Sequence, residues 1–324
     1  MDSIEAVLSG SVRDLAILIS KVENGDPEGW KALRLLYPHT GKAVVIGLTG
    51  PPGAGKSSLI NRMIHAYLGR GLKVAVLAVD PSSPFTGGGV LGDRVRMPQL
   101  NPNLFIRSLA TRGQLGGLSR TAGSIIKLLD AAGYQRIIIE TVGTGQAEVA
   151  IKHYAHTVLV LTIPNMGDDI QTLKSGILEI GDIYVVNKAD LPGADRVEAE
   201  LQDMLCMRGD SGPGWRPPVL YTVAREGRGI ESLMDQVENH REFLMSKGML
   251  SAHRRRLAEF ELTEGLKNLM WERAFKALDR SGAWGEACER VAQGKLDPWL
   301  AVQQLSDGLS RADAEQKSSP EGIR

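Results

Sequence analysis

The sequence predicts an α/β protein built on a mainly parallel, doubly wound sheet, with helices added at both ends of the chain. Short apolar runs alternate with helical patterns through the middle of the sequence, and in that order strands usually lie parallel between two layers of helices. Helical patterns without strand candidates precede and follow this region. At 324 residues the chain is long enough for one large domain with such additions.

The first part of the chain, residues 1–42, is expected to form an N-terminal helical extension. Apolar residues recur at three- and four-residue spacing over 3–22, which predicts an amphipathic helix that ends near Asn24. A short second helix is predicted over 28–37, before the chain enters the first strand candidate.

The central domain is predicted to span residues 43–247. It opens with the continuous apolar run 43–48, which is typical of a buried parallel strand. It closes with a predicted helix over about 230–247. The remaining strand candidates lie at 74–79, 104–107, 137–140, 158–162, 183–187 and 219–222.

Residues 248–305 are expected to form a C-terminal helical arm with an apolar stripe. An appended arm must bury such a stripe in an intramolecular core or against a second copy of the chain, and we favour a homodimer. The basic run 253–256 is interpreted as a helix surface that is solvated or paired with nearby acids, rather than a nucleic-acid patch. The polar residues 306–324 are expected to be disordered. The stripe comprises Leu257, Phe260, Leu262, Leu266, Leu269 and Met270.

Composition excludes several classes of protein. Lys and Arg total 38, as do Asp and Glu, so the overall charge indicates no nucleic acid or acidic membrane as a partner. The two cysteines, Cys206 and Cys288, lie far apart, which argues against a disulfide framework and a structural zinc site. No run approaches ~18 uninterrupted apolar residues, and the first residues match neither a secretory signal nor a transit peptide. We therefore expect a cytoplasmic protein without a membrane span.

A phosphate-binding motif follows the first strand candidate. Residues 50–57 (GPPGAGKS) match the pattern G-x-x-x-x-G-K-[ST] between a strand and a helical stretch, the context that this pattern requires. The glycines let backbone N–H groups surround phosphate oxygens, while Lys56 is expected to reach the β- and γ-phosphates and Ser57 to meet Mg²⁺. A P-loop NTPase fold is therefore predicted. The nucleotide-binding residues expected here are Gly50, Pro51, Pro52, Gly53, Ala54, Gly55, Lys56, Ser57 and Ser58.

A second motif, Asn187, Lys188, Ala189 and Asp190, ends the apolar run 183–187 and predicts which base is bound. The Asp190 carboxylate can accept from both the guanine ring N–H and its exocyclic amine, whereas adenine presents the opposite polarity. A base that leaves buried polar groups unpaired is strongly rejected. The two motifs together predict a protein that binds GTP and GDP, with Asn187, Lys188 and Asp190 in the base site.

A third motif follows the apolar run 137–139, where a P-loop protein places its second acidic residue. Here the acid is Glu140 rather than the usual Asp, and Gly143 follows it. We expect Glu140 to hold Mg²⁺ through a water molecule and the Gly143 N–H to meet the γ-phosphate, so that 143–150 orders with GTP and relaxes after hydrolysis. The alternative is a strand that ends in an exposed glutamate.

The Gly-rich stretch between the second and third strand candidates contains Asp80 and Asp93. Either carboxylate is a candidate for the Mg²⁺ shell or for orienting the attacking water, because a hard cation prefers carboxylate and water oxygens. Which of the two serves Mg²⁺ is left open. Without the surrounding motifs, this stretch would be interpreted as a flexible loop.

Five segments taken together resemble the MeaB/ArgK family of GTPases, which includes a human mitochondrial companion of adenosylcobalamin-dependent methylmalonyl-CoA mutase. The resemblance extends from about residue 5 to residue 303. The segments are 50–58 (GPPGAGKSS), 80–97, 140–146 (ETVGTGQ), 167–180 (GDDIQTLKSGILEI) and 187–190 (NKAD).

The resemblance implies a dimeric GTPase that acts as a chaperone. Slow GTP hydrolysis, stimulated by the partner, would gate delivery of adenosylcobalamin to the mutase and protect the mutase or help it recover from inactivation. Related acyl-CoA mutases are further candidate clients. The resemblance also implies that 164–174 is an additional switch, in which Lys174 meets the nucleotide or activates hydrolysis. A surface lysine on a helix is the alternative.

The chain departs from the family in one motif. Where the family often has a Ser-Ala pair that reads the guanine carbonyl, this chain has Thr222, Val223, Ala224 and Arg225. The backbone N–H of Ala224 can meet the carbonyl without a serine, so we expect the guanine preference to survive. Val223, Ala224 and Arg225 complete the predicted nucleotide-binding residues.

Two other functions compete with this hypothesis. A metallochaperone-type GTPase, for example one that inserts nickel, should carry His- or Cys-rich tracts, whereas the six histidines of this chain are scattered. An ATP-using kinase linked to amino-acid transport would need a phosphoacceptor site, and the guanine-reading motif argues against it.

Overall fold

The computed structural model describes residues 3–80, 101–110, 121–141, 147–164, 175–207 and 214–318. The chain divides into two compact units, Met1–Leu257 and Ala258–Arg324. The first unit contains the N-terminal helices, the sheet and the start of the C-terminal helical region, and the second unit is helical.

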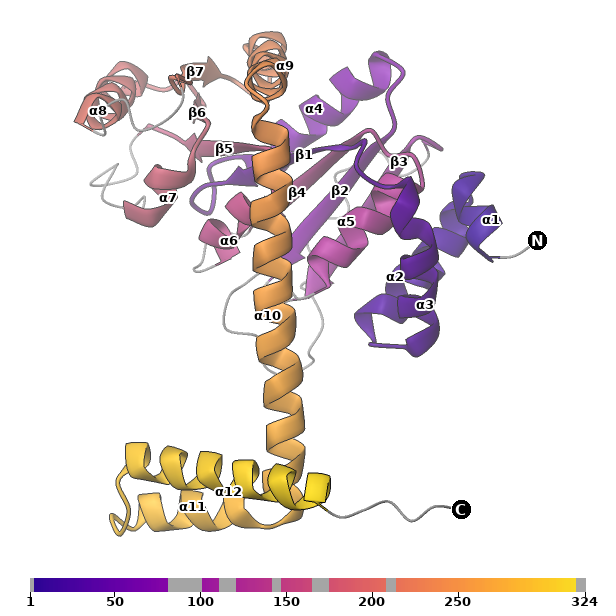
Figure 1. Cartoon of the computed structure of the whole chain (residues 1–324). Helices are drawn as coiled ribbons and strands as arrows, with labels where there is room; N and C mark the ends of the chain where they lie inside the picture. The colour runs from indigo at the N-terminus through magenta and orange to yellow at the C-terminus, as the bar shows by residue number, and fades with distance from the viewer. Residues whose placement is uncertain are drawn as a thin grey trace. The chain divides into compact units, whose positions relative to one another are not determined.

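The core of the first unit is a parallel sheet, which confirms the predicted α/β fold. Within the described residues, seven strands lie in the order β3-β2-β4-β1-β5-β6-β7, and each neighbouring pair is parallel (Figure 1). Each predicted strand candidate overlaps one of these strands. Their bounds are β1 (Val44–Thr49), β2 (Val74–Asp80), β3 (Leu104–Ala110), β4 (Arg136–Thr141), β5 (Thr157–Thr162), β6 (Ile183–Asn187) and β7 (Val219–Thr222).

The strand order places β1 at the centre of the sheet. From β1 the chain moves outward through β2 to β3, returns to insert β4 beside β1, and then continues on the other side through β5, β6 and β7. The order therefore reverses beside β1. Open parallel sheets bind ligands beyond the carboxyl ends of their strands at such a reversal, which points to the ends of β1, β4 and β5.

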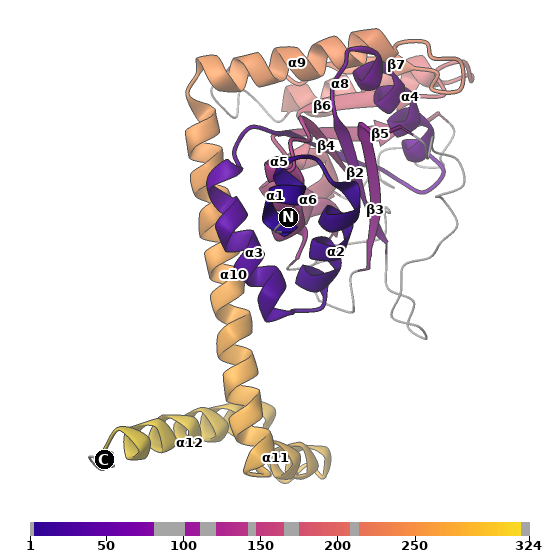
Figure 2. The same cartoon turned by 90° about the vertical axis from the view of Figure 1, so that its right-hand side faces the viewer.

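Helices cover both faces of this sheet. Helices α4 (Lys56–Gly69) and α9 (Ile230–Ser246) pack on one face, and α5 (Ala122–Ala131) and α6 (Ala147–Tyr154) pack on the other (Figure 2). The apolar stripe of α4 is fully buried, and each such side chain contributes about 1.5–3 kcal/mol by leaving water. The helix that follows the phosphate-binding motif is thereby fixed to the sheet. Its buried residues are Leu59, Ile60, Met63, Ile64 and Tyr67.

Two further helices, α7 (Ser175–Ile180) and α8 (Ala194–Met207), follow β5 and β6 along the chain. The N-terminal extension consists of α1 (Ser3–Leu8), α2 (Val12–Glu23), α3 (Pro27–Leu36) and the short 3-10 helix η1 (Tyr37–His39).

The single helix predicted over 3–22 is wrong, because two helices occupy this segment. Ser11 between them has extended backbone, and its hydroxyl accepts a hydrogen bond from the Asp14 N–H at 3.3 Å. This is the geometry of an N-terminal cap, and it starts a new helix. The apolar spacing continues across the break, so periodicity alone does not reveal it.

The N-terminal helices α2 and α3 pack against α5, and Asp130 of α5 fixes the segment that leads from them into β1. The Asp130 side chain is buried. Its carboxylate accepts from the backbone N–H groups of Gly41, Lys42 (3.2 Å) and Ala43 (2.9 Å). Three donors satisfy a carboxylate that would otherwise be costly to bury.

The first unit extends to Leu257, past the predicted domain end at residue 247. Helix α10 (Met249–Arg280) begins in this unit. His253 is buried with its Nε2 atom 2.9 Å from the Ala155 carbonyl, and Arg254 donates to the Gly41 carbonyl at 2.9 Å. The interpretation of 253–256 as a solvated or acid-paired surface is therefore wrong for His253, which is buried, whereas Arg254 is exposed.

The second unit contains the rest of α10 together with α11 (Ala283–Ala292) and α12 (Pro298–Ser318). Trp271, Phe275 and Trp284 form an aromatic cluster, with ring centroids 5.5–5.8 Å apart. Helix α12 continues through 306–318, part of the segment expected to be disordered, and the Ala, Arg, Glu, Gln and Lys residues there favour helix. None of the helices that the structure describes is long and apolar enough to cross a membrane.

Candidate nucleotide site

The phosphate-binding motif connects the carboxyl end of β1 to the start of α4, at the reversal of strand order. Two of its glycines allow contacts that other residues would block. Gly50 has a φ of +147°, and a Cβ atom on it would lie 2.4 Å from the Leu161 carbonyl oxygen of β5. Gly55 has a φ of +89°, and a Cβ atom there would lie 2.5 Å from the Asn187 amide nitrogen. The loop can therefore pack this closely only with glycine at these positions.

The side chain of Lys56 lies inside this loop. It is 7% exposed, and its ammonium group donates to the carbonyls of Gly50 at 2.8 Å and Pro51 at 3.1 Å. Lys56 is also the first residue of α4, and the unpaired N–H groups of a helix N-terminus attract anions. A cation and several backbone donors thus meet at one point, which suits the phosphate groups of a nucleotide.

Ser57 and Glu140 meet beside the loop. The Ser57 hydroxyl donates to a Glu140 carboxylate oxygen at 2.9 Å, and Glu140 is partly buried. The contact follows from the sheet register, because Glu140 on β4 lies opposite Leu48 on β1. A hydroxyl and a carboxylate are hard oxygen ligands, so this pair fits Mg²⁺. The alternative of an exposed glutamate at a strand end does not describe this position.

Thr49 and Thr141 lie beneath the loop and have no counterpart in the sequence predictions. The Thr141 hydroxyl donates to the Thr49 hydroxyl at 3.0 Å, and both residues are fully buried. This bond joins the last residues of β1 and β4. The phosphate-binding motif follows β1, and the motif that contains Glu140 lies at the end of β4. For Thr49, a threonine that ends an otherwise apolar run is the available sequence signal, whereas Thr141 follows Glu140.

Asn187 connects the base-reading motif to the rest of the site. It is 2% exposed, and its amide donates to the Ala54 carbonyl of the phosphate-binding loop at 2.8 Å. Its carbonyl oxygen accepts from the Thr222 hydroxyl at 3.0 Å and from the Ala224 N–H at 3.1 Å. The structure thus brings together three segments that the sequence analysis assigned to one site.

The remaining residues of the motif form a turn. Lys188 has a φ of 56°. Among the described residues, it is the one residue other than glycine with a positive φ. The Ala189 N–H donates to the Thr222 carbonyl at 3.1 Å and so holds the turn against β7. Asp190 is exposed, so its carboxylate is accessible to a ligand. The positive φ of Lys188 is a strained conformation, and such strain is retained where the surrounding structure requires it.

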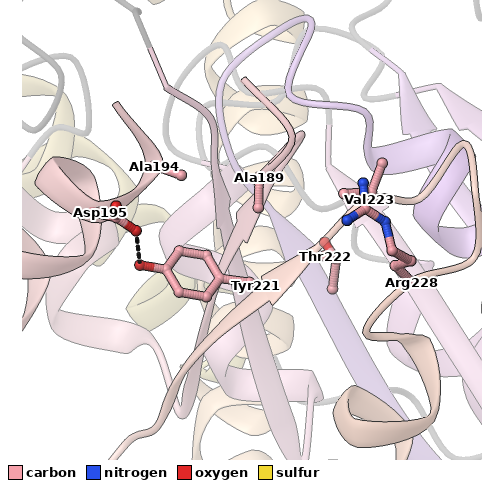
Figure 3. A pocket seen from close by; sticks show the side chains of 7 residues that line it. All are labelled: Ala189, Ala194, Asp195, Tyr221, Thr222, Val223 and Arg228. Atoms are coloured by element: carbon pink, nitrogen blue, oxygen red, sulfur yellow. Dashed lines mark hydrogen bonds between the residues drawn. The ribbon is translucent and has the colours of Figure 1, made fainter. Parts of the chain in front are cut away.

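A small pocket of about 220 Å³ lies beside this turn. Tyr221 and Asp195 point toward each other there (Figure 3), and the Tyr221 hydroxyl donates to Asp195 at 3.1 Å and to Glu198. Desolvation and these two carboxylate hydrogen bonds raise the pKa of Tyr221, so the phenol stays protonated. The pocket is lined by Ala189, Ala194, Asp195, Tyr221, Thr222, Val223 and Arg228.

Four predicted site residues are not placed. Asp93, Gly143 and Lys174 lie outside the described residues, and of Asp80 only the backbone is described, as the last residue of β2. Because β2 lies next to β4 and parallel to it, Asp80 ends at the same edge of the sheet as Glu140.

Comparison with protein families finds one match over most of the chain. The model described as "Methylmalonyl Co-A mutase-associated GTPase MeaB" matches residues 15–279. A relative from Pyrococcus abyssi, named as a GTPase, is 45% identical over 306 residues, which cover 93% of this chain and 94% of the relative. "GTPase ArgK" of Escherichia coli is 32% identical over 94% of this chain and 95% of its own length.

Two further similarities are informative. The "Methylmalonic aciduria type A homolog, mitochondrial" of Mus musculus is 39% identical over 214 residues, which are 64% of this chain and 52% of the mouse protein. Among solved structures, one described as a LAO/AO transport system kinase superposes with a TM-score of 0.73 at 27% identity, covering 95% of this chain and 97% of the other.

Proposed function

Because this chain belongs to the family of methylmalonyl-CoA mutase-associated GTPases and is itself a GTPase, we propose that it assists an adenosylcobalamin-dependent methylmalonyl-CoA mutase. In this role, binding and hydrolysis of GTP gate cofactor loading, protection or reactivation of the mutase. The observation that carries the nucleotide part is the position of Asn187, which contacts both the phosphate-binding loop and the base-reading segment. The mutase part is supported by the family description and by the mouse relative.

The hydrolysis step requires positioning and charge neutralisation. A water oxygen forms a bond to the γ-phosphorus while the bond from that phosphorus to the β–γ bridging oxygen breaks, which leaves GDP and phosphate. Lys56 is placed to neutralise charge on the β- and γ-phosphates. Ser57 and Glu140 would hold Mg²⁺, which supplies further neutralisation of the phosphate oxygens when bound.

The base is selected by two groups. The Asp190 carboxylate accepts from the guanine ring N–H and the exocyclic amine, and the Ala224 N–H donates to the guanine carbonyl. Lys188, Val223 and Arg225 flank the base. Adenine turns its amine toward the Ala224 N–H and offers no N–H donor to Asp190, so ATP leaves that carboxylate unpaired and binds weakly.

The residues that respond to the state of the nucleotide are proposed from the sequence. Asp80 or Asp93 completes the Mg²⁺ shell or orients the attacking water. Gly143 contacts the γ-phosphate, and Lys174 meets the nucleotide when the partner is bound. With these assignments, the segments around the four residues take different conformations in the GTP and GDP forms, as a switch requires.

The second unit supports a homodimer. Large apolar side chains on α10 and α12 are exposed there, with Leu262 at 74%, Met270 at 62% and Trp299 at 70%. Exposed apolar surface of this extent marks an interaction site more often than a solvated helix. We propose that a second copy of the chain covers it.

The label carried by the similar solved structure suggests a kinase linked to amino-acid transport as a second candidate. A kinase of that kind uses ATP and needs a phosphoacceptor substrate. The base-reading groups around Asn187 favour guanine instead, so the GTPase proposal stands first.

A binding experiment tests the proposed partner. The tagged chain is incubated with purified methylmalonyl-CoA mutase, or with a related acyl-CoA mutase, in the presence of GDP or a non-hydrolysable GTP analogue. The proposal predicts co-purification with the mutase and a difference in affinity between the two nucleotides. Absence of binding to every adenosylcobalamin-dependent mutase tried, in both nucleotide states, would contradict it.

A further inference from the structure

Arg62 on α4 contacts the segment that carries the base-reading N–H, residues 223–228, hereafter the base loop. Its Nε atom donates to the Ala224 carbonyl at 2.9 Å, and its Nη2 atom donates to the Arg225 carbonyl. Arg62 lies five residues after Ser57 on the helix that starts at the phosphate-binding loop. Two consecutive carbonyls of the base loop are therefore held by one guanidinium group.

The base loop is a tight turn that presents these carbonyls. The Val223 N–H donates to the Arg228 carbonyl at 3.1 Å, and the Val223 carbonyl accepts from Glu226 at 2.9 Å and Gly227 at 3.0 Å. These bonds close the turn on itself. The carbonyls of Ala224 and Arg225 accept from outside the turn, from Arg62.

The consequence is that Ala224 is fixed on both sides. Its N–H faces the Asn187 carbonyl oxygen at 3.1 Å, and its own carbonyl accepts from Arg62. These two groups belong to successive planar peptide units, and only the φ and ψ angles of Ala224 connect the two planes. Holding both units therefore fixes the peptide that carries the Ala224 N–H. This N–H donates to Asn187 in the structure, and the proposed function has the same N–H also donate to the guanine carbonyl.

We propose that Arg62 is a positioning residue for guanine recognition, which couples the phosphate-binding helix to the base loop. The inference rests on the proposed base-reading role of Ala224. It adds a second connection between the two halves of the site, through α4, to the bond from Asn187 to Ala54. The planar guanidinium group suits this task because it presents donors to two acceptors in a fixed geometry, whereas a lysine ammonium cannot span both.

The test compares GDP with the diphosphate of 2-aminopurine riboside, which keeps the exocyclic amine but lacks the guanine carbonyl and the ring N–H. Wild type is expected to prefer GDP. Arg62→Ala should weaken GDP binding about tenfold, equivalent to about 1.4 kcal/mol, while binding of the 2-aminopurine nucleotide stays nearly constant. Arg62→Lys should give an intermediate loss, and it serves as the folded variant if Arg62→Ala does not fold.

Arg70→Ala is the matched control. Arg70 lies at the end of the same helix, is also exposed, and forms an ion pair with Glu231 of α9 at 2.7 Å rather than a hydrogen bond to a base-loop carbonyl. It should leave the ratio of the two dissociation constants unchanged. Equal weakening of both nucleotides by Arg62→Ala, or no weakening of either, would overturn the role of Arg62 while leaving base reading intact. If wild type itself shows no preference for GDP, the proposed base reading fails, and the inference about Arg62 fails with it.

Discussion

At the scale of single residues, the site depends on side chains that each join distant parts of the chain. Asn187 makes hydrogen bonds to the phosphate-binding loop, to Thr222 and to Ala224. Its amide is nearly inaccessible to water, so losing any partner would leave a buried polar group unpaired, at a cost of about 1–3 kcal/mol. The phosphate-binding loop and the proposed base-reading segment are thereby linked at one residue.

Asp190→Asn should move the base preference from guanine toward xanthine. The new amide can donate to the xanthine carbonyl that replaces the guanine amine, whereas it opposes that amine with a donor. GTP affinity should fall about 100-fold, as expected for the loss of hydrogen bonds to a charged group, and XTP should bind in its place. Competition titrations measure both affinities.

The control for that substitution is Asp195→Asn. Asp195 lines the neighbouring pocket and accepts a hydrogen bond from Tyr221, whereas Asp190 lies in the turn that follows β6. Its substitution should leave the ratio of GTP to XTP affinity unchanged. Unaltered GTP binding by Asp190→Asn would show that another residue reads the base.

At the scale of elements, Asp130 secures the passage from the N-terminal helices into β1. Asp130→Ala removes the acceptor of three backbone N–H groups at a buried position. The unfolding free energy should fall by about 2–4 kcal/mol, because the donors are left without partners. Urea denaturation followed by circular dichroism measures the loss.

Asp203→Ala, at an exposed position of α8, is the control and should change stability by less than about 0.5 kcal/mol. Equal effects of the two substitutions would contradict this role for Asp130.

Three histidines, His156, His240 and His253, give the first unit a dependence on pH. The His156 Nδ1 atom accepts from the Val45 N–H at 3.0 Å, so this ring must be neutral in the folded state. Burial lowers the pKa of His156 to about 3, and the nearby charges contribute to the same shift; these are His253, Arg254, His240 and Arg241. Burial also lowers the pKa of His253 and His240.

Because these pKa values are lower when folded than when unfolded, the unfolded chain binds more protons in acid. Stability is therefore complete above about pH 6.5 and falls below it, by up to about 1.4 kcal/mol per pH unit for each histidine. Thermal unfolding between pH 7.5 and pH 5 measures the slope. His156→Gln should reduce the slope, whereas His65→Gln, at an exposed position, should preserve it. An unchanged slope in His156→Gln would refute this assignment.

The sequence predicts the elements of the sheet well for a physical reason. A strand buried on both faces must be a continuous apolar run, and β1, β5 and β6 are buried at every position. Helix boundaries were harder to predict, since the cap at Ser11 interrupts a spacing that otherwise continues. The helical course of α12 was missed because polar composition alone does not prevent helix formation.

The contacts within the site could be predicted only in part. The motifs that follow three of the strand candidates were assigned to one nucleotide site, and the structure places Ser57 beside Glu140. The bond from Asn187 to Ala54 joins residues 133 positions apart, and the bond from Arg62 to Ala224 joins residues 162 positions apart. Such pairs depend on helix packing, which local patterns do not encode.

At the scale of the whole molecule, one unit carries the nucleotide site and the other carries exposed apolar helices. The matched relatives from Pyrococcus abyssi and Escherichia coli share nearly the full length of the chain, so both units belong to the family arrangement. We interpret the first unit as the GTPase and the second as the homodimer surface. The segments proposed to respond to the nucleotide, around Asp93, Gly143 and Lys174, lie outside the described residues.

The most direct test of the proposed function is the rate of phosphate release from GTP, with and without methylmalonyl-CoA mutase. The account predicts slow release from GTP alone, a higher rate at saturating mutase, and little release from ATP in either case. Lys56→Ala, which lacks the ammonium group inside the phosphate-binding loop, should show no release above background under any condition. The same rate with and without mutase, equal use of ATP, or wild-type turnover by Lys56→Ala would contradict the account.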